Sequence, residues 1–238
     1  MRKVKKFKLT SEFIVDISGV KLFRIKALIE FGNVKAGDLG GYIEKEENLS
    51  HMGDAWVYGD AQISGNAQVS GNAQVSGNAW VSGNAQVFGD AQVFGDAWVS
   101  GDARVFGDAR VSGNARVSGD AQVFGDARVS GNARVFGNAW VSGNAWVSGN
   151  AQVSGDAQVF GDARVSGDKD YAYAHGFGSC NRTTTFFRLK DGDVGVRCGC
   201  FYGTLAQFRD KVCETHGETK KAQEYLMLAD LMEIRFKN

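Results

Sequence analysis

Small apolar and polar residues alternate with a strict period over the middle of the chain. From Gly53 to Ser166 the phrase Gly-Asp/Asn-Ala-x-Val-Ser/Phe is repeated nineteen times without an insertion. In extended backbone Ala and Val, two residues apart, point to one side, and the residues that follow each of them point to the other. The first inward residue is always Ala, and the second is Val except for Ile63. Each phrase therefore predicts a short strand with a small apolar inner face.

The Gly-Asp or Gly-Asn pair that opens each phrase predicts a corner, because Gly reaches positive φ freely and Asp or Asn tolerates it. One such strand cannot bury its inner face alone, so an uninterrupted period predicts stacked coils. Each side is roughly 13 Å long, and three sides make a coil whose interior Val and Ala fill. Nineteen phrases then give six coils and one spare side, about 30 Å of stack.

This phrase, with Ala two places before Val and a Gly-Asn or Gly-Asp corner, resembles the hexapeptide repeat of the left-handed parallel β-helix, the fold of the trimeric bacterial acyltransferases. The resemblance covers about half of the chain. It implies the left-handed sense, which the residues alone do not indicate, since parallel crossovers are normally right-handed.

The flanks carry a second resemblance, to hexapeptide-repeat proteins of bacteria, phages and prophages for which no activity is known. Its motifs are Asp38-Leu39-Gly40-Gly41-Tyr42 with Asn48-Leu49-Ser50, and Cys198-Gly199-Cys200-Phe201 with Thr215-His216-Gly217. It implies a phage or prophage setting.

We predict three segments: an N-terminal β-hairpin cap over 1–52, the repeat over 53–168 and a C-terminal α+β cap over 169–238. Residues 3–28 alternate around Ser18-Gly19, which predicts the first hairpin. Solenoids need caps because an end coil otherwise exposes its apolar interior and an unpaired strand edge.

The C-terminal cap is predicted to hold a hairpin and two helices. Residues 184–189 and 194–201 alternate about the turn 190–193. Thr204 is a helix N-cap with Gln207 three residues on and Gly217 at the end, and Lys220 to Phe236 forms a second helix. The overall prediction is an all-β solenoid, a left-handed parallel β-helix of about six three-sided coils between these caps.

Charge and composition favour neither a nucleic-acid nor a membrane partner. The 238-residue chain is formally neutral, and its repeat carries six Arg against ten Asp. Six scattered Arg are too few for a nucleic-acid groove. No apolar run reaches the length of a membrane span, and a basic start leads into polar residues rather than a signal-peptide core. We expect a cytoplasmic location in a bacterial host, with association with a virion left open.

Four residues of the C-terminal cap form a candidate zinc set. Cys198 and Cys200 share one side of a predicted strand, and Cys213 and His216 share a helix face. Val196, Cys198 and Cys200 are equally the inward residues of a strand under a helix, where free Cys is commonly buried. The spacing fits no known zinc finger, so we expect no metal and no cofactor.

Two functional alternatives stay open besides a binding or assembly module. The acyltransferase resemblance implies a His on a coil and an inserted loop, but the repeat contains neither, and His51, His175 and His216 all lie in the flanks. Carbohydrate binding is favoured by outward Trp residues, which could stack on sugars or simply pack along the coils. They are Trp56, Trp80, Trp98, Trp140 and Trp146.

Sorting the repeat three phrases to a coil gathers the Phe residues on one side. Phe88, Phe106, Phe124 and Phe160 recur there at intervals of eighteen or thirty-six, and Trp140 lies beside the single gap at Ser142. The other two sides carry only Tyr58, Phe94 and Phe136 at that position. These aromatics either stabilise one another, lie under the C-terminal helices, or form an interface.

We favour the interface. The sequence thus predicts a non-enzymatic rigid solenoid that binds a partner through Phe88, Phe106, Phe124, Trp140 and Phe160, most simply a second copy in a homo-oligomer, with another protein or a glycan as further possibilities.

Overall fold

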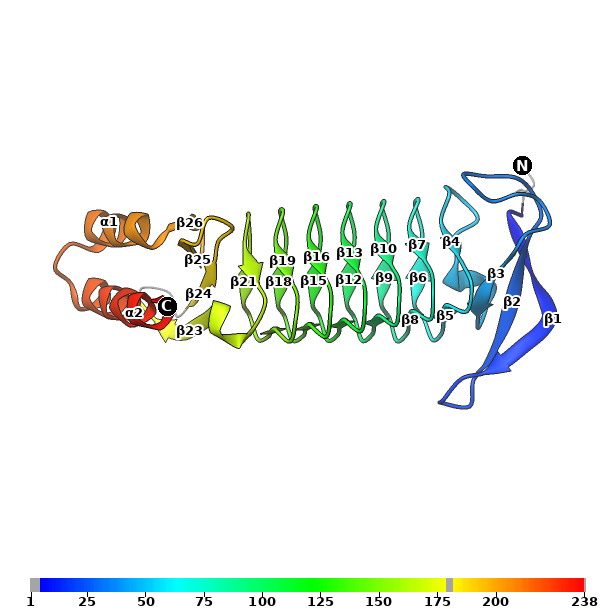
Figure 1. Cartoon of the computed structure of the whole chain (residues 1–238), viewed down its shortest axis with the longest axis horizontal. Coiled ribbons are helices and arrows are strands. Elements are labelled where there is room, and N and C mark those ends of the chain that lie inside the picture. Colours follow the sequence, from blue (N-terminus) through cyan, green and yellow to red (C-terminus); the bar gives the residue numbers. More distant parts are fainter. Residues whose placement is uncertain (1–4, 179–181, 238) are drawn as a thin grey trace.

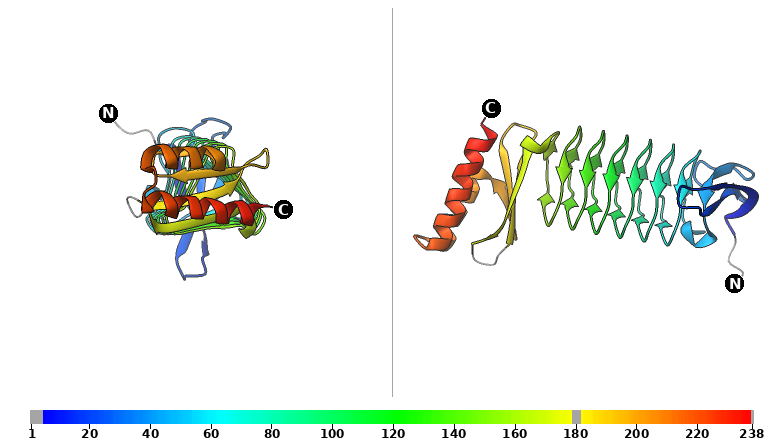
Figure 2. Two further views of the ribbon diagram at one scale, coloured as in Figure 1. Left: turned by 90° about the vertical axis from the view of Figure 1, so that its left-hand side faces the viewer. Right: turned by 90° about the horizontal axis from the view of Figure 1, so that it is seen from below.

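A computed structural model describes residues 5–178 and 182–237 of the chain. Short parallel strands stack into an elongated solenoid, with the N-terminal hairpin at one end and two helices at the other (Figure 1). Seen along its length the molecule is about as narrow as one coil, apart from the projecting tip of the hairpin (Figure 2). The all-β solenoid predicted from the repeat is confirmed.

Three sheets form the sides of the solenoid. Sheet 1 continues from the N-terminal strands into β5 (Gln62–Ile63), β8 (Trp80–Val81), β11 (Trp98–Val99), β14 (Arg116–Val117), β17 (Arg134–Val135) and β20 (Gln152–Val153). Sheet 2 contains β6 (Gln68–Val69), β9 (Gln86–Val87), β12 (Arg104–Val105), β15 (Gln122–Val123), β18 (Trp140–Val141) and β21 (Gln158–Val159). Sheet 3 contains β4 (Trp56–Val57), β7 (Gln74–Val75), β10 (Gln92–Val93), β13 (Arg110–Val111), β16 (Arg128–Val129), β19 (Trp146–Val147) and β22 (Arg164–Val165).

Each strand lies directly on the strand eighteen residues away, as the three-sided coil predicts. Val93 pairs with Val111, for example, and the Gln92 amide donates to the Ala109 carbonyl over 2.9 Å. Every inward Ala and Val of the repeat is buried, and Gly77 at a typical corner has φ +71°. This pairing is the same for either hand of coil, so the left-handed sense stays a prediction.

The N-terminal cap is an antiparallel extension of sheet 1. β1 (Phe7–Val15) pairs with β2 (Lys21–Ala27), and β2 pairs with β3 (Leu39–Ile43). The predicted hairpin turn is confirmed, with Gly19 at φ +82° and the Asp16 carboxylate accepting from the Ser18 and Val20 amides, both over 2.8 Å.

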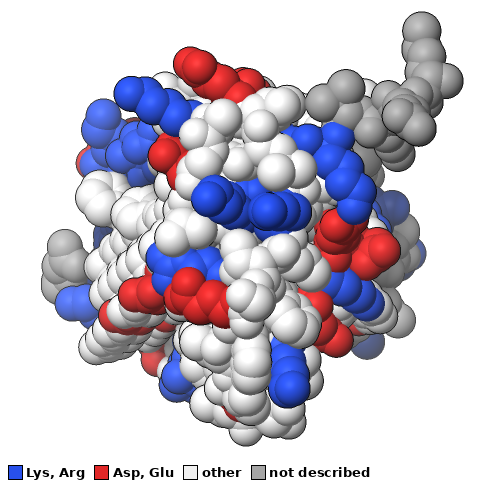
Figure 3. Space-filling model, turned by 90° about the vertical axis from the view of Figure 1, so that its right-hand side faces the viewer, with Lys and Arg blue, Asp and Glu red and all other residues white. Residues whose placement is uncertain are grey.

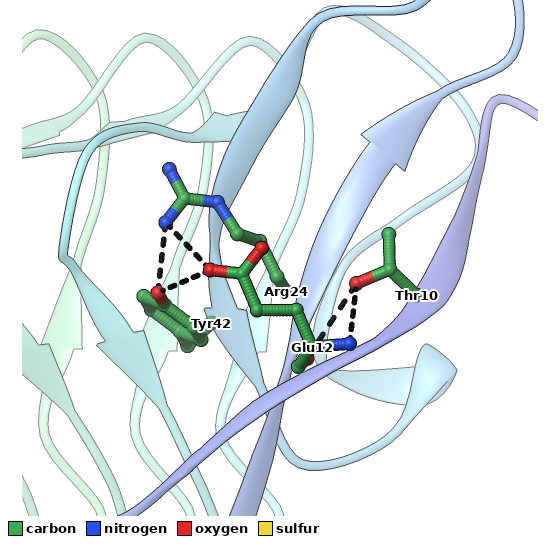
Figure 4. A network of polar contacts seen from close by, with 4 residues as sticks. All are labelled: Thr10, Glu12, Arg24 and Tyr42. Atoms are coloured by element: carbon green, nitrogen blue, oxygen red, sulfur yellow. Dashed lines mark hydrogen bonds and ion pairs between the residues drawn. The ribbon is translucent and has the colours of Figure 1, made fainter.

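A polar cluster ties these three strands together (Figure 4). Arg24 of β2 donates to the Tyr42 hydroxyl of β3 over 2.7 Å and to Glu12 of β1 over 3.3 Å. The Tyr42 hydroxyl donates to the same Glu12 carboxylate over 3.1 Å, and Thr10 accepts from the Glu12 amide over 3.2 Å. Since Tyr42 also pairs with Gln62 of β5, the cluster fastens the hairpin to the strands of the repeat.

The cap also adds two sides to the coil stack. β3 pairs in parallel with β5, and Leu49, just after the 3₁₀ helix η1 (Glu46–Asn48), bridges to Val69 of β6. With β4 they complete a coil ahead of the predicted six. Among the described residues the solenoid therefore has about seven turns.

Two side chains replace hydrogen-bond donors that a further coil would supply. Lys6 Nζ donates to the carbonyls of Gly53 and Ala55 over 3.1 and 2.7 Å. Asn48 Nδ2 donates to the carbonyls of Gly65 and Ala67 over 3.1 and 2.8 Å. Unpaired buried carbonyls are unfavourable, so these two residues let the stack begin without an open edge.

The buried Lys6 ammonium should make stability depend on pH. Burial lowers the pKa of Lys6 from 10.5 to about 8, against the opposing effect of the nearby Asp54 charge. Between about pH 8 and 10.5 the unfolded chain then binds more protons than the folded chain, so this contribution to stability rises with pH.

We expect the free energy of unfolding of the wild type, minus that of Lys6→Met, to increase across this range in denaturant titrations. A difference that stays constant with pH would contradict a lowered Lys6 pKa.

The C-terminal cap is a four-stranded antiparallel sheet under two helices. After the 3₁₀ helix η2 (Asp168–Asp170) come β23 (Tyr171–Phe177), β24 (Arg182–Arg188), β25 (Val194–Cys198), β26 (Phe201–Thr204), α1 (Leu205–His216) and α2 (Lys220–Phe236). The Thr204 capping box with Gln207 and both helix ranges are confirmed, and Gly217 ends α1. The predicted hairpin is the middle of this larger sheet.

This sheet closes the solenoid because its two faces bury different partners. Along β24, Phe187 packs into the core of the solenoid, whereas Phe186 packs under the helices with Phe208 and Tyr225. Among the described residues no helix is long and apolar enough to cross a membrane.

Candidate assembly interface

The candidate surface lies along the edge where the chain passes from sheet 2 to sheet 3. We call it the Phe edge and define it by Phe88, Phe106 and Phe124, which follow β9, β12 and β15. Successive rings stack in parallel, with centroids 4.9 Å apart and interplanar angles of 2° and 3°. The strand register of eighteen residues therefore brings the predicted aromatic ladder together.

The ladder continues beyond Phe124 onto the face of sheet 2. Trp140 of β18 meets Phe124 edge-on, with centroids 6.2 Å apart, and is 42% exposed. Ser142 is buried at the gap in the Phe column. Trp140 thus extends the aromatic surface by one coil where Phe is missing.

The structure places Phe160 at the junction with the C-terminal cap. Its ring meets the Tyr202 ring at 5.3 Å, and the Arg197 guanidinium lies 5.4 Å from its centroid. Phe88, Phe106 and Phe124 are half-buried, chiefly by one another, and both helices lie past the end of the coils (Figure 1). The described helices therefore leave the Phe edge uncovered, and the outer edges of its stacked rings face solvent.

The N-terminal end offers a less distinctive surface. Groups of both signs lie side by side across it (Figure 3). Lys5 pairs with Glu46 over 2.7 Å and Arg24 with Glu12 over 3.3 Å. Because these charges largely compensate one another, we do not place the partner at this end.

The candidate zinc residues do not converge. The predicted strand through Cys200 is broken, because Gly199 turns the chain at φ +58° and Phe201 pairs back with Cys198. Cys200 is exposed in this turn, and Cys213 is exposed on α1. His216 stacks on Tyr225, with centroids 5.7 Å apart. Within residues 5–178 and 182–237 no group of three potential ligands could hold a metal ion.

The Cys198 thiol has its own polar partners instead. The Thr184 hydroxyl donates to Cys198 Sγ over 3.1 Å, and the thiol points to the Tyr225 hydroxyl at 3.9 Å. This arrangement matches the alternative interpretation of Cys198 as a packed residue of a strand beneath a helix.

Histidine chemistry is not assembled on the coils. His51 Nδ1 accepts the Lys6 amide over 3.2 Å, its Nε2 lies 3.7 Å from Glu46, and its ring stacks on Phe7 at 4.4 Å. His175 bonds the Thr183 hydroxyl over 3.0 Å. Both residues have clear structural partners within the caps.

Four of the five Trp residues face outward, but Trp56 does not. It is only 1% exposed, because Phe7 and Phe31 of the N-terminal cap cover it at 6.2 and 5.3 Å. The position of Trp56 in its phrase predicts an outward, exposed side chain, and this prediction was wrong. The cap covers outward positions on the first coils and can bury them.

The remaining ladders confirm the predicted packing between coils. Trp98 lies over Trp80 with centroids 4.9 Å apart, and the Arg116 guanidinium lies 5.0 Å from the Trp98 centroid. Arg164 lies 5.9 Å from the Trp146 centroid. Ring faces that pack against neighbours are less available to sugars, which weakens the carbohydrate alternative.

Comparison with protein families identifies the repeat. Six windows match the family model described as the YdcK beta solenoid repeat, at residues 61–77, 67–83, 73–89, 109–125, 121–135 and 127–143. These windows all lie in the coils and cover less than a third of the chain. A search of curated proteins finds no match to this chain. It is a β-solenoid repeat protein, an architecture that fits a structural or binding module.

The Arg residues of the repeat are less scattered than the sequence suggested. Five of the six lie on sheets 3 and 1, which meet at one edge. Four of these form two pairs in register on neighbouring strands, whereas Trp146 separates the fifth, Arg164, from Arg128. They are Arg110, Arg116, Arg128, Arg134 and Arg164. Sorting Arg by the eighteen-residue period, as was done for Phe, would have revealed this grouping.

Proposed function

We propose that the protein is a non-enzymatic, rigid assembly module that associates with further copies of itself through the Phe edge and Trp140. The observation that carries this proposal is the continuous ladder of aromatic rings from Phe88 to Trp140, which the described helices leave uncovered. The flank motifs that resemble phage and prophage proteins support such a setting for the assembly.

The geometry of the ladder favours a second solenoid as the partner. Rings held 4.9 Å apart on a rigid stack form a straight apolar strip, which another straight surface can match without rearrangement. Such a strip exposes about a few hundred Å², a size typical of interaction surfaces. Aromatic residues near the centre of an interface commonly supply most of its affinity.

Replacing Phe106 and Phe124 by Ser should dissociate the assembly and leave the fold intact. Ser is the residue that most phrases carry at this position, so the coils accept it. Multi-angle light scattering should show a lower mass than for the wild type, while the circular dichroism spectrum stays unchanged.

The matched control is the pair Phe94→Ser and Phe136→Ser, which removes two isolated rings that are 38% and 37% exposed on the other columns. This control should keep the mass of the wild type. If Phe106→Ser with Phe124→Ser also keeps it, self-association does not use the Phe edge. The exposed stripe of Met227, Leu231 and Ile234 on α2 would then be the next surface to test.

A further inference from the structure

Five of the ten Asp residues of the repeat lie in the corner column beside the Phe edge. Two residues after each Phe of the ladder comes an Asp, at Asp90, Asp108 and Asp126. Each corner Asn from Asn66 to Asn144 donates from its side chain to the corner residue one coil on, as Asn72 does to Asp90 over 3.0 Å. Asp90, Asp108 and Asp126 stack on one another at this corner, and a carboxylate has no N–H to donate. No side-chain hydrogen bond can therefore link these three residues as it links the Asn residues. The Phe edge is therefore flanked by a column of like charges, Asp90, Asp108 and Asp126, which we call the Asp column.

The edge where sheet 3 passes into sheet 1 has the opposite character. Its corner residues on the coils of Asp108 and Asp126 are Asn114 and Asn132, with Asn150 one coil on, and hydrogen bonds of 3.1 Å join the three; on the coil of Asp90 the corner residue here is Asp96. Exposed Arg110 and Arg128 lie in register on the sheet 3 side, and exposed Arg116 and Arg134 on the sheet 1 side. We call these four residues the Arg ridge.

Neither set of charges finds a counter-ion within the described chain. The ion pairs of residues 5–178 and 182–237 lie in the two caps and include none of the Arg ridge, Asp108 or Asp126. Like charges directly opposite each other on neighbouring strands are unfavourable. Both ladders therefore gain from an opposite charge brought by another molecule.

We infer that the Arg ridge of one copy receives the Phe edge and the Asp column of a second copy. This inference rests on the proposed self-association and names the surface that the Phe edge meets. The two ladders share one spacing, because both follow the coil repeat. Asp108, at a corner, and Arg110, at the start of β13, are two residues apart in one phrase, and Asp126 and Arg128 are related in the same way. The two charge sets therefore lie at nearly equal heights along the solenoid.

Equal heights match the symmetry of a head-to-tail contact. Rotation about an axis parallel to the solenoid keeps every coil at its height, so Asp108 meets Arg110 of the second copy and Asp126 meets Arg128 of the second copy. The contact joins two different edges of the two copies. If the same rotation, applied repeatedly, returns to the first copy, the copies form a closed ring. Arg guanidinium groups can also lie against the rims of Phe rings or over their faces, as Arg197 does at Phe160.

Charge reversal tests this pairing. Asp108→Arg with Asp126→Arg turns the Phe edge basic, so it should repel the Arg ridge and raise the dissociation constant of the assembly at least about tenfold. Arg110→Asp with Arg128→Asp should have a similar effect. The chain that carries all four changes has exchanged its charges and should assemble again.

The control is Asp102→Arg with Asp120→Arg, which reverses two stacked carboxylates at an edge that carries Ser instead of the Phe ladder. It should leave the dissociation constant unchanged. The inference is overturned if Asp108→Arg with Asp126→Arg assembles like the wild type, or if the fourfold change fails to restore assembly. If Phe106→Ser with Phe124→Ser dissociates the protein in that case, the proposed function stands and only the identity of the facing surface is wrong.

Discussion

Replacing Val123 by Asp should abolish the folded solenoid. Val123 is fully buried at the centre of the stack, between Val105 and Val141 of the neighbouring coils. The inward positions around it are Ala and Val, so a carboxylate there would have no polar partner. Burying an unpaired charge costs several kcal/mol or more, which is comparable to the whole stability of a domain.

The same substitution one residue earlier is the control. Gln122 lies on the outward side of β15, so Gln122→Asp should retain the fold. Circular dichroism should show a β-rich spectrum and a cooperative thermal transition for Gln122→Asp and their loss for Val123→Asp. Equal thermal midpoints for the two variants would contradict the inward parity of Val123.

Replacing a corner glycine should be the next most damaging change. Gly77 has φ +71°, and a Cβ added there would lie 2.9 Å from the carbonyl oxygen of Gly95 on the next coil. Two effects then add in Gly77→Ala: a left-handed backbone conformation that Ala adopts at a cost of about 1 to 2 kcal/mol, and a contact that forces the coils apart.

Two other glycines separate these effects. Gly59 has φ +61°, but an added Cβ would meet its nearest atom only at 3.6 Å, so Gly59→Ala should show the backbone effect alone. Gly167 has extended backbone and open space, so Gly167→Ala should be nearly neutral. The thermal midpoint should therefore be highest for Gly167→Ala, lower for Gly59→Ala and lowest for Gly77→Ala. A Gly77→Ala variant as stable as Gly59→Ala would show that the coils have room for a methyl group.

The coils were predictable because each phrase encodes its own local structure. The alternation of inward and outward positions predicts that Val123 is buried. The eighteen-residue coil predicts which residues stack above and below Phe106. The helix beginning after Thr204 was predictable for the same reason, since its capping residues are close in the sequence.

The ends of the stack were not predictable, because they depend on contacts between distant segments. Lys6 reaches carbonyls nearly fifty residues away, and nothing near it in the sequence marks it as a buried donor. Trp56 has the parity of an outward residue, yet Phe7 and Phe31 cover it. The turn at Gly199 was missed because the alternation of 194–201 continues through it.

The mass of the unmodified chain in solution tests the central claim most directly. Sedimentation equilibrium at neutral pH, over a range of protein concentrations, gives this mass without assumptions about shape, which matters for so elongated a molecule. Self-association through the Phe edge predicts an integral multiple of 25.6 kDa at micromolar concentration and above. A mass of 25.6 kDa at every concentration would contradict it.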